Sequence, residues 1–295
     1  MEPNKPCWCG SGKKYKKCHK AFDEKLHTLM LQGKIVPGHE LIKTPEQIEK
    51  IRISAQLNTG VLDAVAREIR AGMSTQEIDD IVYTYTTEHG GIPAPLNYEG
   101  FPKSVCTSIN DQICHGIPSE DDILEDGDIV NVDVSTILDG YFSDASRMFM
   151  IGDVPDNAKR LIKVTEECVL KGLEAAKPWG YLGDIGEAVN THAMANGYSV
   201  VRDIGGHGIG LEFHEDPFVS YVTKKGTEMV LAPGMMFTIE PMINEGSCEY
   251  VVDEDNGWTV YTYDGGLSAQ IEYMVLITDT GVEVLTKEPA GNGTP

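Results

Sequence analysis

The segment 129–144 constrains the fold of this chain most strongly, because two runs rich in β-branched residues flank an Asp-Gly dipeptide at 139–140. Asp-Gly between such runs is a strong signal for a β-hairpin with a two-residue turn. That turn places Ser135 opposite Asp144, and strand alternation puts Asp133 on the same face as Ser135. The two carboxylates are then diagonal neighbours, roughly 7 Å apart at the backbone.

Two carboxylates on the inner face of one hairpin need a compensating charge. They repel each other, and burial without a partner costs them hydration free energy. A bound cation would relieve both penalties. Either Asp alone could simply end a strand, but Asp133 and Asp144 together, with further carboxylates later in the chain, favour a metal site.

Length and charge limit the possible classes of protein. The 295 residues, 41% of them hydrophobic, allow one large domain or two small ones with a sizeable core. Residues 1–20 carry six Lys and one Glu, a net charge of +5, so the formal total of −22 leaves −27 for the remainder. A body this acidic is a poor candidate for binding DNA, and its charge indicates a well-hydrated surface.

Cysteine usage and the absence of targeting signals predict a cytoplasmic protein. The seven Cys are an odd number, and three of them lie in the first eighteen residues. The N-terminal segment has lysines but no apolar core typical of a secretory signal. No run of 18 apolar residues exists, so we expect no membrane span. These features indicate a reducing compartment rather than a disulfide framework.

The N-terminal segment has the ligand spacing of a zinc site. Three Cys and one His, the ligand set of many tetrahedral zinc sites, fall within thirteen residues: Cys7, Cys9, Cys18 and His19. A segment this short has no core of its own, so the metal would supply its folding free energy. The alternative is a disordered basic tail with incidental cysteines. The spacing resembles the SEC-C zinc motif, which also occurs at the C-terminus of the SecA translocation motor.

Helix and strand patterns occur twice in the same order. Capping boxes at Thr44 and Ser74 mark two helix starts. Helices are expected over about 44–72, 74–90, 156–176 and 183–196, with strand-rich segments at 92–150 and after 197. An offset of 107 residues superimposes the halves and carries Asp133 onto Glu240. We therefore expect an α+β domain made of duplicated helix–helix–strand halves around a pseudo-two-fold axis.

Two further segments supply candidate ligands. His207 lies in a glycine-rich loop where nothing bulky hinders the approach of a metal. The loop is a weak candidate for phosphate binding, because it lacks the strand-to-helix context and a following Lys. Glu272 lies inside an apolar strand, although a lone Glu there could also protect a sheet edge. Four carboxylates and one imidazole suit a pair of divalent ions.

These motifs together resemble the type I methionine aminopeptidases, which have the pita-bread fold. The matching stretches are Asn131-Val132-Asp133 with Asp144 eleven residues on, Gly206-His207-Gly208-Ile209-Gly210, Phe213-His214-Glu215, Thr238-Ile239-Glu240-Pro241-Met242 and Ala269-Gln270-Ile271-Glu272. The resemblance covers residues 40–288 and implies an antiparallel curved sheet with helices outside. We accordingly divide the chain into the zinc motif (1–20), a linker (21–43), the metallopeptidase domain (44–288) and a tail (289–295).

The resemblance assigns a role to each matching position. It implies metal ligands at Asp133, Asp144, His207, Glu240 and Glu272. It implies substrate-facing histidines at His115 and His214, and a methionine pocket formed by Tyr98, Phe101, Cys106, Phe213 and Trp258. Three positions depart from the family pattern: Tyr273 where His is usual, Phe142-Ser143 where His-Gly is common, and Pro95 where some members have Cys. These departures concern support of the site and pocket shape rather than metal binding.

The implied activity is removal of the initiator methionine from nascent proteins whose second residue is small. Two divalent ions, Co, Mn, Fe, Zn or Ni, would hold a bridging hydroxide that attacks the scissile carbonyl. His214 would stabilise the oxyanion, His115 would contact the peptide nitrogen, and Glu240 would shuttle the proton to the leaving amine. We expect a monomer whose residues 1–20 dock on the ribosome, with an acidic chaperone or a merely solvated tail as alternatives.

Two rival functions remain at this point. An aminopeptidase P or prolidase shares the fold but usually carries a large extra N-terminal domain, and only about forty residues precede the catalytic body here. A non-enzymatic relative could use the fold to bind ribosomes or histones. Such relatives typically lose metal ligands, whereas all five are present in this chain.

Overall fold

A computed structural model of the chain describes residues 1–287; residue 288 and the expected tail, 289–295, lie outside the described residues. The α-helices are α1 (Lys20–Leu31), α2 (Pro45–Glu68), α3 (Thr75–Glu88), α4 (Asp156–Ala175) and α5 (Leu182–Ala195). Short 3-10 helices span Tyr15–Lys17, His39–Leu41 and Tyr98–Gly100.

The strands form one large sheet and two small ones. They are β1 (Ile92–Pro93), β2 (Cys106–Ile109), β3 (Gln112–Cys114), β4 (Ile129–Leu138), β5 (Tyr141–Met150), β6 (Ser199–Val200), β7 (Gly206–Gly208), β8 (Glu215–Val219), β9 (Met236–Ile239), β10 (Met242–Asn244), β11 (Tyr250–Val252), β12 (Val260–Thr262), β13 (Ser268–Gln270), β14 (Glu272–Ile277) and β15 (Val282–Val284). The large sheet has the order β1-β4-β5-β14-β9-β7-β8, with β2 beside β4 and β15 beside β14.

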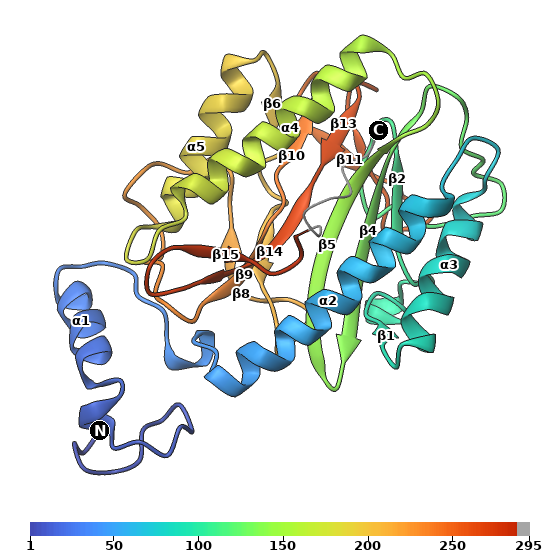
Figure 1. Cartoon of the computed structure of the whole chain (residues 1–295). Coiled ribbons are helices and arrows are strands. Elements are labelled where there is room, and N and C mark those ends of the chain that lie inside the picture. The colour runs from blue at the N-terminus through green and yellow to red at the C-terminus, as the bar shows by residue number, and fades with distance from the viewer. Residues whose placement is uncertain (288–295) are drawn as a thin grey trace.

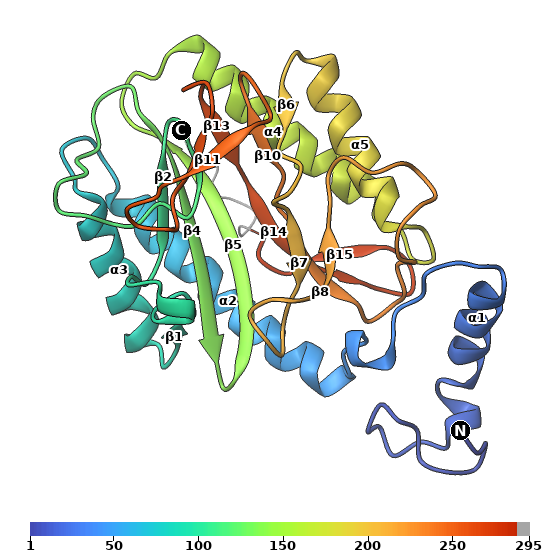
Figure 2. The same ribbon diagram turned by 180° about the vertical axis from the view of Figure 1, so that it is seen from behind.

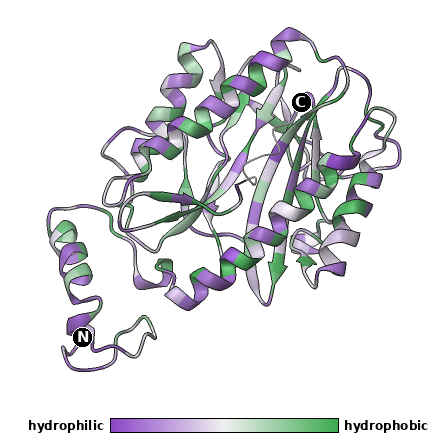
Figure 3. Cartoon of the chain, in the orientation of Figure 1, coloured by the Kyte–Doolittle hydropathy of each residue, from purple (hydrophilic) through white to green (hydrophobic). Residues whose placement is uncertain are grey.

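Helices α2 to α5 lie on one side of the large sheet, and its strands pair antiparallel. Figure 1 shows these helices in front of the strands, and Figure 2 shows the strands exposed from behind. The expected α+β class is therefore confirmed. Hydrophobic and hydrophilic residues alternate along the helices in Figure 3, as expected for helices that cover a sheet. Within the described residues, no helix has the length and apolar character needed to span a bilayer.

The hairpin β4–β5 has the register that the sequence predicts. Ser135 pairs with Asp144, and Asp133 pairs with Ser146, so the two Asp residues are diagonal neighbours on one face. Asp139 and Gly140 both have positive φ angles, 53° and 83°. Those angles define a primed turn, whose twist matches that of the flanking strands. The turn chemistry therefore fixes which side chains face the site.

The internal duplication is visible in the element boundaries. Helices α3 and α5 are related by the offset of 107 residues at both ends, and β4 and β9 start at positions related by the same offset. Figure 1 shows α2 and α3 over one half of the sheet and α4 and α5 over the other. The hydrophobic core is correspondingly divided, with one cluster under each helix pair. The two halves bring Asp133 and Glu240 to one cavity between them.

The N-terminal module, residues 1–41, stands beside the body and packs on it through α1 and the chain that follows (Figure 1). The ring centroids of Phe22 and Trp179 are 5.4 Å apart. Ile35 forms a parallel β-bridge with Met229 on the body. The segment expected as a linker therefore includes a helix and a strand-like contact with the body.

Candidate active site

A cavity of about 490 Å³ is lined by every active-site residue that the sequence analysis named. These residues are Asp133, Asp144, His207, Glu240, Glu272, His115, His214, Tyr98, Phe101, Cys106, Phe213 and Trp258. They come from both halves of the duplicated domain. The fold therefore gathers side chains separated by up to 174 positions of sequence at one cavity.

The five candidate metal ligands come from adjacent parts of the large sheet. Asp133, Asp144 and His207 lie on β4, β5 and β7, Glu240 follows β9, and Glu272 begins β14. Strand β14 pairs with both β5 and β9, which places Glu272 between the two halves. Their order in the sheet explains why these distant residues meet.

One subset of these side chains has the spacing of a metal site. Ligand atoms of Asp144, His207 and Glu272 all lie within 4.8 Å of one another. His207 Nε2 lies 3.8 Å from Asp144 Oδ2 and 3.7 Å from Glu240 Oε1. Asp133 lines the same cavity one diagonal step from Asp144. The oxygen and imidazole donors suit divalent first-row metal ions.

Buried oxygens without partners support the same interpretation. Within residues 1–287, Asp133 Oδ1 and Glu272 Oε1 are buried and have no hydrogen-bond partner. Unsatisfied buried carboxylate oxygens are costly, and metal coordination is one of the few ways to compensate them. The donor set and its unsatisfied atoms therefore fit divalent metal ions.

The electrostatics of the cluster are those of carboxylates held close together. Burial raises the pKa of Asp133 to about 7. Burial, followed by the charge of Asp133, holds the pKa of Asp144 well above its ordinary value. Burial likewise raises the pKa of Glu240 to about 8, and burial with the charge of Asp144 strongly raises that of Glu272. Bound cations would favour the ionised form of all four.

The metal-free protein is expected to lose stability as the pH rises from about 6.5 to about 8. With folded pKa values near 7 and 8, Asp133 and Glu240 still bind protons in this window, whereas at ordinary values of 3.8 and 4.5 the unfolded chain has released them. The folded state binds more protons, so the free energy of unfolding falls with rising pH. His115 and His207, whose burial lowers their pKa from 6.5 to about 4, bind protons only in the unfolded chain, so they oppose this fall at the acid end of the window without reversing it.

Thermal unfolding of chelator-treated protein at pH 6.5 and pH 8 measures this effect. The variant Glu240→Gln should show a shallower decline, because one titrating carboxyl is gone. A melting temperature that increases across the window would contradict the prediction.

Hydrogen bonds from neighbouring residues orient Glu240. No role was predicted for these residues from the sequence. Thr238 Oγ1 donates to Glu240 Oε1 at 2.6 Å, and Gln270 Nε2 donates to Glu240 Oε2 at 2.9 Å. The hydroxyl of Tyr221 accepts from the Glu240 N–H at 2.7 Å. Strand alternation could have indicated Thr238 and Gln270, because each precedes a candidate ligand by two residues and therefore shares its face of the strand.

Two histidines lie above the cluster. His115 has a positive φ of 57°, and burial lowers its pKa to about 4. His214 Nδ1 lies 3.0 Å from the hydroxyl of Tyr98, and its ring centroid is 4.3 Å from that of His207. Partial desolvation lowers the pKa of His214, with Glu99 acting in the opposite direction. Both imidazoles are thus neutral donors or acceptors near pH 7.

The remaining predicted residues form an apolar pocket with aromatic walls. Tyr98 packs edge-on against Phe213 with centroids 4.8 Å apart, and Phe101 packs edge-on against Trp258 at 5.3 Å. Cys106 is buried among them and lines the same cavity. An unbranched thioether side chain suits such a slot, because sulfur makes favourable contacts with aromatic rings. Ile204, Phe218 and Met242 add apolar surface to the cavity, and no pocket role was predicted for them from the sequence.

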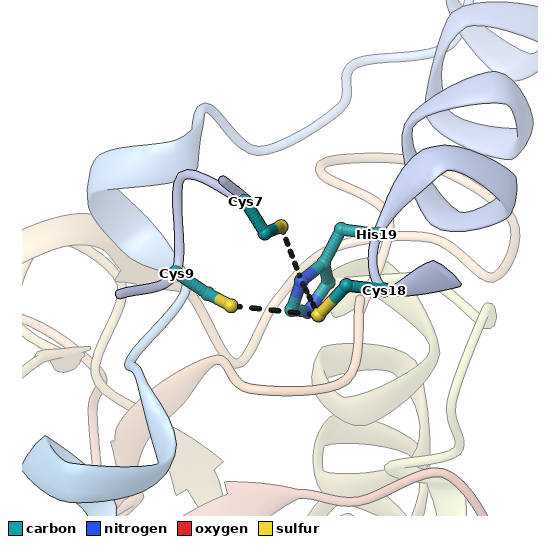
Figure 4. Close-up of side chains that lie close together, drawn as sticks. All are labelled: Cys7, Cys9, Cys18 and His19. Carbon is teal, nitrogen blue, oxygen red and sulfur yellow. Dashed lines mark hydrogen bonds between the residues drawn. The ribbon is translucent and has the colours of Figure 1, made fainter. Parts of the chain in front are cut away.

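The four predicted zinc ligands converge in the N-terminal module (Figure 4). Cys7 Sγ lies 3.2 Å from His19 Nδ1, and Cys18 Sγ lies 3.3 Å from the same nitrogen. Cys9 Sγ and Cys18 Sγ are 3.6 Å apart, and all four ligand atoms lie within 4.8 Å of one another. Ligands of a tetrahedral Zn²⁺ at about 2.3 Å would be separated by roughly 3.8 Å, so the set matches such an ion.

Comparison with known families agrees with this geometry. The model of metallopeptidase family M24 matches residues 49–279, and that of the SEC-C motif matches residues 4–21. The chain therefore belongs to metallopeptidase family M24, which also supports a divalent-metal requirement. Within that family it belongs to the methionine aminopeptidases of type I, as the following relatives show.

The alignments with these relatives cover most of this chain and nearly all of each relative. Methionine aminopeptidase A of Synechocystis is 52% identical over 240 residues, covering 81% of this chain and 94% of the relative. Methionine aminopeptidase of Chlamydia pneumoniae is 44% identical over 97% of this chain and 99% of the relative, so that match includes most of the N-terminal module. The crystal structure of the Rickettsia prowazekii enzyme aligns with a TM-score of 0.82 and 46% identity, covering 83% of this chain and 99% of that chain. The predicted family and pita-bread fold are confirmed.

Proposed function

We propose that this enzyme removes N-terminal methionine by means of two divalent metal ions held by Asp133, Asp144, His207, Glu240 and Glu272. The observation that carries the proposal is that all five side chains, two of them with unsatisfied buried oxygens, line one cavity. When bound, the two ions would lower the pKa of a water molecule and polarise the scissile carbonyl. The clustered carboxylates would also attract the α-ammonium group that only a chain terminus carries.

Glu240 is the proposed proton shuttle. The donors Thr238 and Gln270 fix its two oxygens, so one carboxylate edge stays directed at the cavity. In that position Glu240 accepts the proton of the attacking water and passes it to the leaving amine.

His214 is the proposed donor to the developing oxyanion. Its Nδ1 faces the Tyr98 hydroxyl, and when Tyr98 donates to Nδ1 the ring proton resides on Nε2. A neutral imidazole of that tautomer presents an N–H to the carbonyl oxygen. His115, which lines the same cavity, would contact the peptide nitrogen.

Selection of the methionine side chain would follow from the aromatic pocket. The pocket formed by Tyr98, Phe101, Phe213 and Trp258 would hold the methionine side chain. The requirement for a small second residue is carried over from the family resemblance. The substrates would be nascent polypeptides in the cytoplasm.

A peptide panel tests this function. Purified protein loaded with Mn²⁺ or Co²⁺ should cleave Met-Ala-Ser at least tenfold better than Met-Leu-Ser and should leave an X-Pro peptide uncut. A chelator should abolish cleavage, and two equivalents of metal should restore it. Comparable cleavage of Met-Leu-Ser would refute the small-residue requirement, and full activity at one equivalent would refute the two-metal site.

We further propose that the N-terminal module holds one Zn²⁺ and docks the enzyme on the ribosome. The ligand distances around Cys7, Cys9, Cys18 and His19 support the zinc. The +5 charge of residues 1–20 suits RNA phosphates, which the acidic body would repel. Ribosome docking would bring the cavity to the emerging N-termini.

Deleting residues 1–38 should leave tripeptide cleavage within about twofold of the full chain, because the deletion spares Ile42 and the cavity. It should remove one zinc per chain and weaken co-sedimentation with ribosomes, and salt should weaken binding of the full chain in the same way. Metal analysis, tripeptide kinetics and sedimentation measure the three effects. Loss of cleavage with the active-site metals still bound would place the module in the catalytic machinery instead.

A further inference from the structure

An ion pair in the interior of the protein lies directly behind His214. Lys43, whose side chain is 1% exposed, pairs with Glu215, whose side chain is 10% exposed. The two residues are 172 positions apart. Glu215 is the first residue of β8 and follows His214 directly. The pair therefore joins the segment before α2 to the segment that carries the proposed oxyanion donor.

Glu215 organises the histidine loop, residues 209–214, which connects β7 to β8. Its Oε1 accepts hydrogen bonds from the backbone N–H groups of Leu211 and Glu212, at 2.7 and 3.0 Å. Its other oxygen, Oε2, binds the Lys43 ammonium group. One carboxylate thus satisfies two loop amides while a cation holds the carboxylate in place. Such charge-assisted hydrogen bonds are the stronger kind and fix geometry.

Lys43 is itself held firmly. Its backbone N–H donates to the carbonyl of Gly234 at 2.9 Å. Its aliphatic stem passes beside Gly210, where an added Cβ would lie 3.3 Å from Lys43 Cε. The loop is fixed at its other end by the N–H of Phe142, which donates to the Gly210 carbonyl at 3.0 Å. The anchor is therefore part of the packed body rather than a mobile surface side chain.

We infer that the Lys43–Glu215 pair positions His214 for catalysis. The inference rests on the proposed function, which makes His214 the oxyanion donor. Buried ion pairs contribute little net stability compared with apolar replacements, so positioning is the better explanation for this one. A displacement of about 1 Å in a catalytic group can cost about 10²-fold in rate. Lys43 and Glu215 are positioning residues, because they act through the loop and not on the substrate.

The test replaces the pair without leaving a single charge in the interior. In Lys43→Met/Glu215→Met, called the Met/Met variant (the variant with Glu215→Gln is called Met/Gln), both charges and the acceptor for the loop amides are lost. In Lys43→Met/Glu215→Gln, both charges are lost but one acceptor oxygen for the amides of Leu211 and Glu212 remains. Asp63→Asn is the matched control, because Asp63 accepts from Arg147 at 2.8 Å in a partly buried ion pair between α2 and β5, away from the loop.

Each variant is measured in the native background and together with His214→Ala, with kcat, KM and bound metal determined on metal-loaded full-length enzyme. We expect the Met/Met variant to lower kcat at least tenfold in the native background and less than threefold in the His214→Ala background. The Met/Gln variant should recover most of kcat, and Asp63→Asn should leave it unchanged. Such non-additivity identifies action through a shared residue.

Equal losses of kcat in both backgrounds would overturn the positioning role and leave the proposed function standing. Native kcat in both double variants, Lys43→Met/Glu215→Met and Lys43→Met/Glu215→Gln, would do the same. Full activity of His214→Ala alone would overturn both, because the pair would then have no catalytic group to position. Bound metal and the circular dichroism spectrum identify any variant that failed to fold. A Lys43→Met/Glu215→Met variant with native metal content and unchanged kcat counts against the inference.

Discussion

Replacing Asp133 with Ala is expected to abolish turnover while leaving the fold intact. Asp133 extends from a hairpin whose register places it one diagonal step from Asp144, at the floor of the cavity. Its buried Oδ1 has no hydrogen-bond partner among the described residues, as expected of an oxygen whose partner is an ion. Without this carboxylate the site should lose at least one of two metal equivalents. Metal analysis and tripeptide kinetics at saturating Mn²⁺ measure both effects.

Removing the charge of Asp133 is expected to stabilise the metal-free protein above pH 7. Burial raises the pKa of Asp133 to about 7, so at pH 8 the folded protein must hold this carboxylate ionised at an energetic cost. The isosteric variant Asp133→Asn removes the charge without leaving a cavity, and its chelated form should melt at a higher temperature than the native protein at pH 8. The difference should shrink at pH 6.5, where the native Asp133 is protonated. Near-normal turnover of either variant would refute the ligand assignment.

The sequence predicted the parts of this fold whose causes are local. Asp139-Gly140 requires a turn with two positive φ angles, and that turn sets the register of the whole hairpin. Capping boxes at Thr44 and Ser74 mark the starts of α2 and α3, and both are present in the structure. The offset of 107 residues predicted the arrangement of the second half, because α5 repeats α3 at both ends.

The candidate site was predicted largely through family resemblance, because no local pattern brings Asp133 and Glu272 together. The features that the sequence did not indicate are contacts between segments that are far apart in the chain. Lys43 and Glu215 are 172 positions apart, and neither lies in a periodic pattern that points to the other. The packing of Phe22 on Trp179 likewise joins two regions that look like a linker and a turn. Contacts of this kind follow from the assembled fold rather than from any single segment.

Replacing His214 with Ala is expected to lower kcat by about 10²–10³ while both metal ions stay bound, because one positioned donor to an oxyanion is worth roughly 3–4 kcal/mol. The hydroxyl of Tyr98 lies 3.0 Å from Nδ1, and when it donates to that nitrogen it holds the ring in the tautomer that donates through Nε2. Tyr98→Phe should therefore produce a smaller loss of kcat, since it removes the support and spares the imidazole. His89→Ala is the matched control, because His89 lies at the end of α3 and stacks on Tyr85, away from the cavity.

The metal content of His214→Ala separates this role from that of a ligand. Its imidazole lies close to His207, with ring centroids 4.3 Å apart, so a direct bond to metal is the main competing explanation. A ligand would be lost together with metal, and added Mn²⁺ would restore part of the activity. An oxyanion donor instead lowers kcat at full metal occupancy, with a small change in KM, because the hydrogen bond strengthens only as charge develops on the carbonyl oxygen. Native kcat with both ions bound would exclude the role proposed for His214.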